Sequence, residues 1–410
     1  MIESILIIIT SISILLVIYH HIGYPIILKL IQSKLHQHSE LALTKRHYSA
    51  CDSDKQLPSL TLIIPAYNEQ QWIADKIYNC TAIDYPADKL TIIIACDGCS
   101  DNTVGIAQYT LTKPACQDLN IEIRDFSENR GKVAVLNDVI NSVNSDLVAL
   151  SDVSALISLD AFLIAATQFK TKKLGVINSH YCLLNPGSVG EANYWEYQSK
   201  IKLAESELGS TLGAHGALYI FRRELFTPLA ADTINDDFIL PMTIVAGGHL
   251  AKQDNRIVAV ELEQANSSMD WQRRIRIATG NMQQVLRLKN MLHPHYGGVA
   301  FNFASGKTLR VLMPFLMLSS LIGSILLAPY HLIFMLLAGV QVLLYIVAGL
   351  QLTVMTNSNN KLLKMLAYLV SGHLAGLVGA LTYLVNDTKT PWKPVYSTAP
   401  SKEKDHENSI

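Results

Sequence analysis

The stretch LTLIIPAYNE (residues 60–69) decides the fold, because a run of apolar residues ends abruptly in a short polar loop. LTIIIACDGCSDNT (90–103) and DLVALSDVSALIS (146–158) repeat this pattern, and a further apolar run covers residues 121–126. Helical segments separate the four runs, which indicates strands alternating with helices. We therefore expect an α/β, Rossmann-like domain with a mainly parallel sheet, whose ligands bind at the carboxyl ends of the strands.

Acidic residues stand at the ends of these apolar runs. Asp97 and Asp152 end the second and the fourth run. The pair Asp236 and Asp237 lies further along, in TINDDFILPMTIVAGGHL (233–250). Carboxylates gathered at one edge of a sheet can hold a divalent cation against a diphosphate and leave one group as a base.

The remaining apolar residues are concentrated at the two ends of the chain. Of its 410 residues, 50% are hydrophobic and 16% are charged, compared with roughly 25% charged residues in soluble domains. Residues 4–19 form a run that approaches the length of a membrane span, and three more runs cover 309–327, 330–353 and 362–386. We therefore expect an integral membrane protein with α-helical transmembrane segments.

Positive charge indicates the side of the membrane on which the middle of the chain lies. Lys29, Lys34, Lys45 and Arg46 follow the first apolar run, which favours a cytoplasmic location for the segment that comes next. A cleaved signal peptide is the alternative, but no Lys or Arg precedes this run and no small-residue cleavage site follows it. Four spans would place the lysine-bearing tail after Asp387 outside, against the charge rule.

Net charge and cysteine usage argue against a nucleic-acid-binding protein and against a disulfide-stabilised one. The net charge of −1 gives no bulk attraction to nucleic acid, so we expect no nucleic-acid partner. The six cysteines show no disulfide framework, which fits a reducing cytoplasm. The expected segments are an N-terminal transmembrane helix 1–25, a basic cytoplasmic linker 26–57, the α/β domain 58–295, an interfacial segment 296–308, three transmembrane helices 309–387 and a polar tail 388–410.

Three motifs occur in the order and at the spacing of a known family. PAYNE (65–69), DGCSDNT (97–103) and NRGKVAVLN (129–137) resemble the nucleotide loop, the DGSxDxT turn and the RxGKxxALN segment of membrane-embedded family 2 glycosyltransferases with the GT-A fold. This family includes the synthases of cellulose, hyaluronan, chitin oligosaccharide and poly-N-acetylglucosamine. The resemblance implies a nucleotide-sugar site that includes Ala66, Tyr67, Glu69, Asp97, Arg130, Lys132, Asp152, Arg274 and Arg276.

The resemblance gives Asp97 and Lys132 separate roles. Asp97 would contact the nucleobase or ribose, since a carboxylate accepts a hydrogen bond from an imide N–H. Lys132 would contact the phosphates as a compact positive charge. The alternative is that Asp97 only forms a local turn and that Lys132 is solvated.

Asp152 stands where the family has a DxD triplet that binds a metal ion, but here the triplet is Asp152-Val153-Ser154. Ser154 is a weak neutral ligand or a partner for a metal-bound water. Because Mg²⁺ needs only one or two protein carboxylates besides substrate phosphates, one aspartate can suffice for Mg²⁺ or Mn²⁺. The alternative is that Asp152 only caps a helix.

A glycine-rich segment, GSTLGAHGALYIFRRELF (209–226), resembles the acceptor side of these synthases. Gly213, His215 and Gly216 are its candidate acceptor-side residues. An ordinary loop that enters a strand is the alternative. Trp195 lies in the helix before this segment. Its ring is suited to stacking on a sugar, but packing within the protein is the favoured interpretation.

The pair Asp236 and Asp237 matches the family's TED-type motif. Counted back from Gly248, Asp237 falls on the general base, which would take the proton from the acceptor hydroxyl. Asp236 replaces the more usual Glu and is the second catalytic candidate. The alternative is that both are acids that favour the start of a helix.

MDWQRRIRIATGN (269–281) takes the place of the family's QxxRW motif. Arg273 stands at the Gln position, Arg274 and Arg276 hold the basic positions, and Ile277 replaces the Trp. Arginines can pair with a diphosphate, although a basic helix face is the alternative. The missing aromatic argues against a long-chain synthase that secretes its own product.

Taken together, the resemblance implies an inverting, metal-dependent glycosyltransferase in polysaccharide synthesis. It would transfer a hexose or N-acetylhexosamine from a nucleotide diphosphate sugar, a UDP-sugar by preference, to a glycan. One alternative is transfer of a single sugar to a lipid-linked acceptor, and a second is a catalytically silent membrane scaffold. The implied partners are the donor, the acceptor, membrane lipid and polysaccharide export or assembly proteins. The implied location is the plasma (inner) membrane, with a cytoplasmic catalytic domain.

Overall fold

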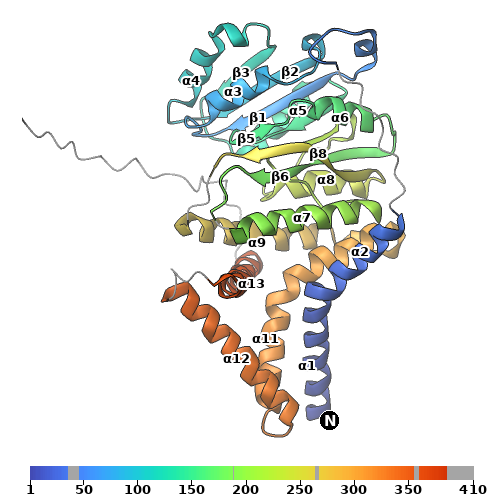
Figure 1. The fold of residues 1–410 in the computed structure, drawn as a ribbon, viewed down its shortest axis with the longest axis vertical. Helices are drawn as coiled ribbons and strands as arrows, with labels where there is room; N and C mark the ends of the chain where they lie inside the picture. The colour runs from blue at the N-terminus through green and yellow to red at the C-terminus, as the bar shows by residue number, and fades with distance from the viewer. Residues whose placement is uncertain (36–45, 188, 264–266, 355–359, 386–410) are drawn as a thin grey trace, which may run out of the picture.

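The computed structural model describes residues 1–35, 46–187, 189–263, 267–354 and 360–385. An α/β domain forms one end of the molecule, and a set of apolar helices extends from the other (Figure 1). Lys45 and the predicted tail 388–410 lie outside the described residues.

One eight-stranded sheet forms the centre of the α/β domain, in the order β3-β2-β1-β4-β7-β6-β8-β5. Strands β1 to β4 pair in parallel, whereas β7 runs antiparallel to both of its neighbours, and β5 runs antiparallel to β8. The predicted mainly parallel, Rossmann-like fold is confirmed. The strands are β1 Leu60–Ala66, β2 Leu90–Asp97, β3 Ile121–Phe126, β4 Leu147–Leu150, β5 Ala155–Ile157, β6 Leu174–Leu183, β7 Tyr219–Arg222 and β8 Leu250–Glu261.

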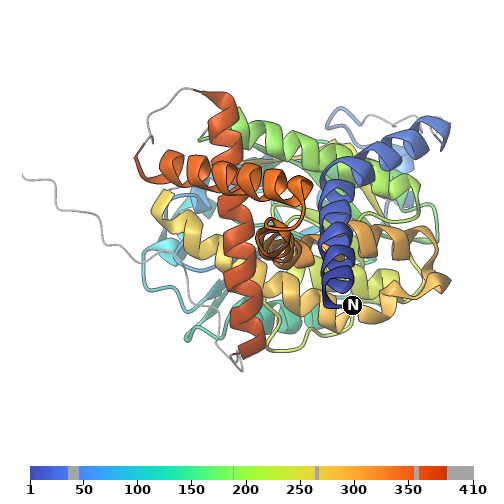
Figure 2. The same ribbon diagram turned by 90° about the horizontal axis from the view of Figure 1, so that it is seen from below.

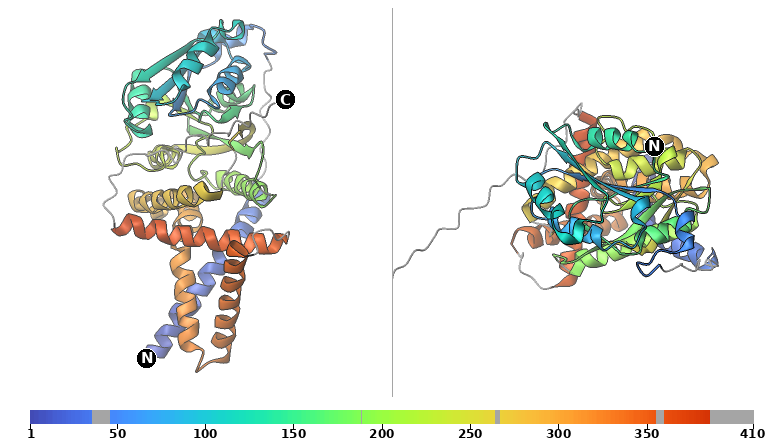
Figure 3. Two further views of the ribbon diagram at one scale, coloured as in Figure 1. Left: turned by 90° about the vertical axis from the view of Figure 1, so that its left-hand side faces the viewer. Right: turned by 90° about the horizontal axis from the view of Figure 1, so that it is seen from above.

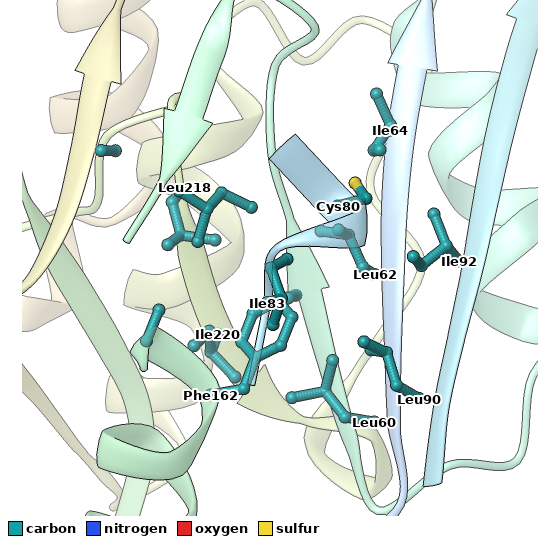
Figure 4. Packing of buried hydrophobic residues seen from close by; sticks show 14 of the residues in the cluster. Leu60, Leu62, Ile64, Cys80, Ile83, Leu90, Ile92, Phe162, Leu218 and Ile220 are labelled. Atoms are coloured by element: carbon teal, nitrogen blue, oxygen red, sulfur yellow. The ribbon is translucent and has the colours of Figure 1, made fainter. Parts of the chain in front are cut away.

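Strand β1 is buried on both faces, which explains its nearly unbroken apolar sequence. Leu62 and Ile64 point into a cluster on one side that includes Phe162, as Figure 4 shows, whereas Ile63 belongs to the cluster on the other side. This alternation follows from the two-residue period of a strand. The helices of the domain are α3 Ile73–Thr81, α4 Thr103–Leu111, α5 Lys132–Ser142, α6 Ala161–Gln168, α7 Val189–Glu207, α8 Asp236–Ala246 and α9 Ser267–Arg287.

The parallel register brings the strand ends together. Ala66 at the end of β1 pairs with Cys96 in β2, and Asp97 pairs with Phe126 at the end of β3. The loops that follow these three strands therefore leave the sheet at the same edge.

Four helical stretches are long and apolar enough to cross a membrane: Ile2–Ser33, Gly298–Leu327, Leu332–Thr353 and Lys361–Val385. The first continues without a break through residues predicted as linker. The second includes the residues predicted as the interfacial segment. Their elements are α1 Ile2–Ile18, a π-helix Tyr19–Gly23, α2 Tyr24–Leu35, α10 Gly298–Asn302, a π-helix Phe303–Thr308, α11 Leu309–Leu327, α12 Leu332–Thr353 and α13 Lys361–Val385.

Helices α1 and α11 form an antiparallel pair that points away from the α/β domain. Ser13 Oγ donates a hydrogen bond to Ser319 Oγ at 3.2 Å, and Gly323 lies against the Thr10 side chain. Their close approach depends on these small side chains.

Helix α13 has a different orientation from α1 and α11. It lies across their near ends, roughly perpendicular to them and beneath α9, in Figures 2 and 3. A Cβ at Gly379 would stand 2.6 Å from Ala278 Cβ in α9, so the two helices touch closely. The third span predicted after the domain, 362–386, corresponds to α13, which has the composition of a span but lies along the surface of the domain that faces the other apolar helices, as far as its described residues 361–385 show.

Candidate functional site

The loops after β1 and β2 are joined into one unit at the edge of the sheet. Asn68 adopts a positive φ of 57°, and its side-chain Oδ1 accepts a hydrogen bond from the Ser100 backbone N–H at 2.8 Å. The Glu69 backbone N–H donates to Thr103 Oγ1 at 2.8 Å. The two motifs predicted from the sequence to bind the nucleotide therefore support each other directly, beside Ala66 and Tyr67.

Asp97 fixes the loop that precedes α5. Its two carboxylate oxygens accept hydrogen bonds from the backbone N–H groups of Arg130 and Gly131, at 2.9 and 2.8 Å. Gly98, with a φ of 62°, allows this approach, because a Cβ there would stand 2.3 Å from the Asn129 backbone nitrogen. Asp97 thus positions Lys132, the first residue of α5. We call residues 66–69, 97–103 and 129–132 the donor edge.

Lys132 lies between carboxylates that come from distant parts of the chain. Its Nζ donates to Asp152 Oδ1 at 3.0 Å and stands 3.7 Å from Asp236 Oδ2. Burial opposes its charge, but Asp152, Asp236 and Asp237 outweigh burial and raise the pKa of Lys132. The ammonium therefore remains charged and ties the donor edge to the start of α8.

Asp152 lies directly after β4, as the sequence predicted for a strand end. Although burial raises its pKa, Lys132 is the main influence that lowers it, so Asp152 is ionised. Gly216 allows a close approach, since a Cβ there would stand 2.7 Å from Asp152 Oδ2. Beneath this point, the fully buried Lys76 donates to Ser151 Oγ at 2.6 Å, and burial lowers its pKa to about 8.

The predicted catalytic pair begins α8. Burial, followed by the neighbouring charge of Asp236, raises the pKa of Asp237 to about 6. Its backbone carbonyl accepts a hydrogen bond from the Ala214 N–H at 2.8 Å, which ties it to the glycine-rich segment. Asp236 points toward Lys132, and within the described part of the chain its Oδ2 atom is buried without a hydrogen-bond partner. The two neighbouring carboxylates therefore have different surroundings.

His215 belongs to an aromatic cluster beside these carboxylates. Its ring stacks on Tyr181 with 3.7 Å between centroids, and Trp195 meets it edge-on at 5.2 Å. Burial lowers the pKa of His215 to about 3, so the ring is neutral. Trp195 packs within this cluster, in line with the packing interpretation. We call Gly213, His215 and Gly216 with this cluster the acceptor side.

A comparison with known families agrees with this geometry. Residues 61–228 match the model of the family described as Glycosyl transferase family 2. The chain carries a family 2 glycosyltransferase domain. Asp236, Asp237 and α9 lie beyond the matched residues.

Curated relatives are similar to part of this chain. The poly-beta-1,6-N-acetyl-D-glucosamine synthase of Staphylococcus aureus (strain COL) is 27% identical over 240 residues, and that of Staphylococcus epidermidis is 26% identical over 241 residues. Each alignment covers 57% of this chain and 57% of the relative. The similarity is therefore confined to little more than half of each protein.

A solved structure shares the fold over most of the chain. The mannosyltransferase PcManGT from Pyrobaculum calidifontis, in complex with GDP-Man and Mn²⁺, is 22% identical and has a TM-score of 0.66. The match covers 90% of this chain and 99% of that one. The GT-A fold of the glycosyltransferase domain and the attachment of apolar helices to it thus have a solved counterpart.

Two of the predicted basic residues, Arg130 and Arg274, have other partners in the structure. Arg130 pairs with Asp138 at 2.6 Å and stacks on Phe126, so only its backbone N–H serves the donor edge. Arg274 turns toward α13. Arg276 has a buried Nε atom. Arg273, which the sequence placed at the Gln position, is one of the charges that act on His215 and Tyr181.

Acidic residues lie near Asp152, and no motif indicated two of them, Glu261 and Glu263. Burial and then the charge of Glu263 raise the pKa of Glu69 to about 8, with further contributions from Asp152 and Glu261. Glu261 ends β8, which pairs with β5, and its carboxylate hydrogen-bonds Ser154. Sequence analysis missed Glu261 because the pairing of β8 with β5 is not visible in a local motif.

The residues around Asp152 fit a metal ion that is held mainly by substrate phosphates. The Asp152 side chain is 38% exposed, and Ser154 supplies a hydroxyl beside it. In the part of the chain that the structure describes, no group of three or more His, Cys, Asp or Glu side chains is arranged to hold a metal. A site with one protein carboxylate suits Mg²⁺ or Mn²⁺ bound together with a diphosphate.

Proposed function

We propose that the chain is an inverting glycosyltransferase that uses a nucleotide diphosphate sugar at a membrane surface. The observation that carries this proposal is Lys132, which joins Asp152 and Asp236 next to Asp237, at the edge where the β1 and β2 loops meet. A cation and an ionised carboxylate suit a diphosphate and its metal ion, and a carboxylate with a pKa of about 6 suits a general base.

In this proposal the donor edge binds the nucleotide. Asp97 holds the loop at the ribose and base, and Glu69 lies between this loop and Asp152. Asp152, with the Ser154 hydroxyl, would hold a Mg²⁺ or Mn²⁺ ion. When bound, that ion would balance the charge of the leaving diphosphate. Lys132 would supply a second positive charge to the phosphates.

Asp237 is the proposed general base. Its carboxylate takes the proton from the acceptor hydroxyl while that oxygen attacks the anomeric carbon. The bond from this carbon to the diphosphate oxygen breaks, and the nucleoside diphosphate leaves. A single displacement without a covalent intermediate inverts the anomeric configuration.

The relatives support a sugar-nucleotide donor and a glycan product. Two are synthases of a β-1,6-linked N-acetylglucosamine polymer, and PcManGT is in complex with GDP-Man and Mn²⁺. We propose a hexose or N-acetylhexosamine donated by a UDP-sugar. We also propose a plasma (inner) membrane location with the domain on the cytoplasmic side.

A donor panel tests this function. The full chain in detergent or nanodiscs is incubated with individual UDP- and GDP-sugars and Mg²⁺ or Mn²⁺, and release of nucleoside diphosphate is measured. We expect release with a UDP-sugar, and the mass of the product separates one added sugar from a polymer. No release with any donor would support a silent scaffold and would falsify the enzyme proposal.

A further inference from the structure

A group of basic side chains lies where the apolar helices meet the α/β domain. His20 Nδ1 is 3.0 Å from the Ser305 carbonyl oxygen, and the rings of His21 and His373 stand edge to face with 5.3 Å between centroids. Arg310 interacts electrostatically with all three histidines. The group joins the π-helix Tyr19–Gly23, α11 and α13, which are far apart in the sequence. We call Arg310, His20, His21 and His373 the junction cluster.

Arg310 is the exposed cation of this cluster. It lies within Gly298–Leu327, one of the stretches apolar enough to span a membrane. Among the described residues, its guanidinium has neither a hydrogen-bond partner nor a salt bridge. Arg310 is the second residue of α11, and an arginine near the end of a membrane-spanning helix directs its guanidinium to the interface, where lipid phosphates lie.

The depth of the cluster corresponds to the head-group level of a bilayer. At the far end of α1, Glu3 contacts His331 at 2.9 Å, which gives one polar boundary of the helical pair. Seventeen residues of helix from Glu3 to His20 rise by about 26 Å. The hydrocarbon core of a bilayer is about 30 Å thick, so the junction cluster lies close to its other boundary. Helix α13 lies flat at the same level (Figure 3).

Two largely buried lysines lie between the junction cluster and the proposed base. Lys202 and Lys307 interact electrostatically with Arg310 on one side and with Asp237 on the other. Lys307 lies over the Phe238 ring, 3.9 Å from its centroid, and Lys202 donates to the Leu212 carbonyl at 2.7 Å. Basic residues thus continue from the membrane boundary to the acceptor side.

We propose that the junction cluster binds the phosphate of a lipid whose polar end is the sugar acceptor. Arginine is suited to phosphate because it presents several N–H donors in a planar array. Basic pockets between membrane helices on the cytoplasmic side bind lipid head groups by this chemistry. The acceptor role rests on the proposed glycosyltransferase function, whereas lipid binding does not.

Lipid binding by the full chain tests the site. The protein is reconstituted in phosphatidylcholine nanodiscs that contain a polyisoprenyl phosphate, and bound lipid is measured by native mass spectrometry. We expect Arg310→Gln to weaken binding about tenfold, because it removes charge-assisted hydrogen bonds. Arg310→Lys should restore part of it. Lys361→Gln, which removes an exposed cation at the start of α13, is the matched control and should bind as the unaltered chain does.

A competition experiment distinguishes a lipid acceptor from other sources of phosphate. We expect neither phosphatidylglycerol nor inorganic phosphate to displace the polyisoprenyl phosphate at equal concentration. Equal displacement by phosphatidylglycerol would overturn the acceptor assignment, and unchanged binding in a folded Arg310→Gln protein would overturn the site. Folding of each variant is checked by its melting temperature and by UDP binding.

The two proposals fail in different ways. If the unaltered chain binds the lipid phosphate but releases no nucleotide from any donor, the glycosyltransferase function and the acceptor role fail, and the lipid site stands. If nucleotide is released and Arg310→Gln binds the lipid normally, the enzyme proposal stands and the lipid site fails.

Discussion

The donor edge and the acceptor side are neighbours, but different interactions hold them in place. At the donor edge, the side chains of Asp97 and Asn68 bind backbone N–H groups of adjacent loops. Around the acceptor side, charged residues from four helices interact electrostatically with one another or with His215. They are Lys202 of α7, Asp237 of α8, Arg273 of α9 and Arg310 of α11. The difference indicates that the donor edge is preorganised by hydrogen bonds between its own loops, whereas the acceptor side depends on docking of the domain against its membrane helices.

The largest expected effect concerns the two adjacent carboxylates of α8. Asp237→Asn removes the proposed base and should lower the rate of sugar transfer about 1000-fold, since general bases contribute roughly 10² to 10⁴. Donor affinity, measured by calorimetry with UDP, should change little. Asp236→Asn is the matched control, because its side chain points toward Lys132 instead. A larger loss of transfer in the control would reverse the assignment.

A smaller effect should come from the two basic residues of the donor edge. Lys132→Met should weaken donor binding about 100-fold, because it removes the cation that contacts both Asp152 and Asp236. Arg130→Met should change it less than about threefold, because that side chain pairs with Asp138 on the surface. Equal losses in the two titrations would mean that Arg130 turns into the site when the donor binds.

A glycine tests how rigid the donor edge is. Gly98→Ala places a Cβ 2.3 Å from the Asn129 backbone nitrogen at a φ of 62°, so we expect a loss of about 2 kcal/mol in the free energy of unfolding. Gly372→Ala in α13 is the control, since nothing lies within 4 Å of its Cβ position. Thermal melting of the two variants compares them. An unchanged melting temperature for Gly98→Ala would show that the loop adapts.

The motifs of the donor edge could be predicted from the sequence because each comes after an apolar strand, although the hydrogen bonds that join them connect residues more than 30 positions apart. Ala66, Asp97 and Lys132 follow strands whose apolar runs are unmistakable, and the structure brings them to one edge. The acceptor side was harder to predict. Arg273 interacts electrostatically with His215, whereas Arg274, which was expected at the site, contacts α13, because the packing of α9 decides which of the two neighbouring residues is turned toward the site.

The remaining differences between the prediction from the sequence and the structure also come from long-range contacts. Glu261 reaches Ser154 only because β8 pairs with β5. The orientation of α13 depends on its contact with α9 through Gly379, and its composition is that of a span. Hydropathy reports which residues avoid water, and it does not distinguish a helix that crosses a bilayer from one that lies beneath a domain.

The pH dependence of the transfer rate is a further test of Asp237 as the base, and its expected effect is smaller. The pKa of Asp237 is raised from 3.8 to about 6 by burial and Asp236, so the base is ionised above pH 6 and protonated below it. Transfer should fall about tenfold from pH 7 to pH 5. The same raised pKa means that Asp237 adds stability below pH 4, which is lost as the pH rises through 6. Rates that are independent of pH between 5 and 7 would argue against Asp237 as the base.

The smallest expected effect lies at the contact between the domain and α13. The Arg274 guanidinium lies over the Tyr368 ring, 4.4 Å from its centroid, and its NH1 donates to Ser371 Oγ at 3.4 Å. Arg274→Ala and Tyr368→Ala should each destabilise the protein, and the double variant should show a coupling of about 0.5–1 kcal/mol. If α13 crossed the bilayer instead, Tyr368 would lie within the membrane, away from Arg274 in α9, and the coupling would be zero. Melting curves in nanodiscs therefore test whether α13 lies on the membrane surface, and with it the docking on which the acceptor side depends.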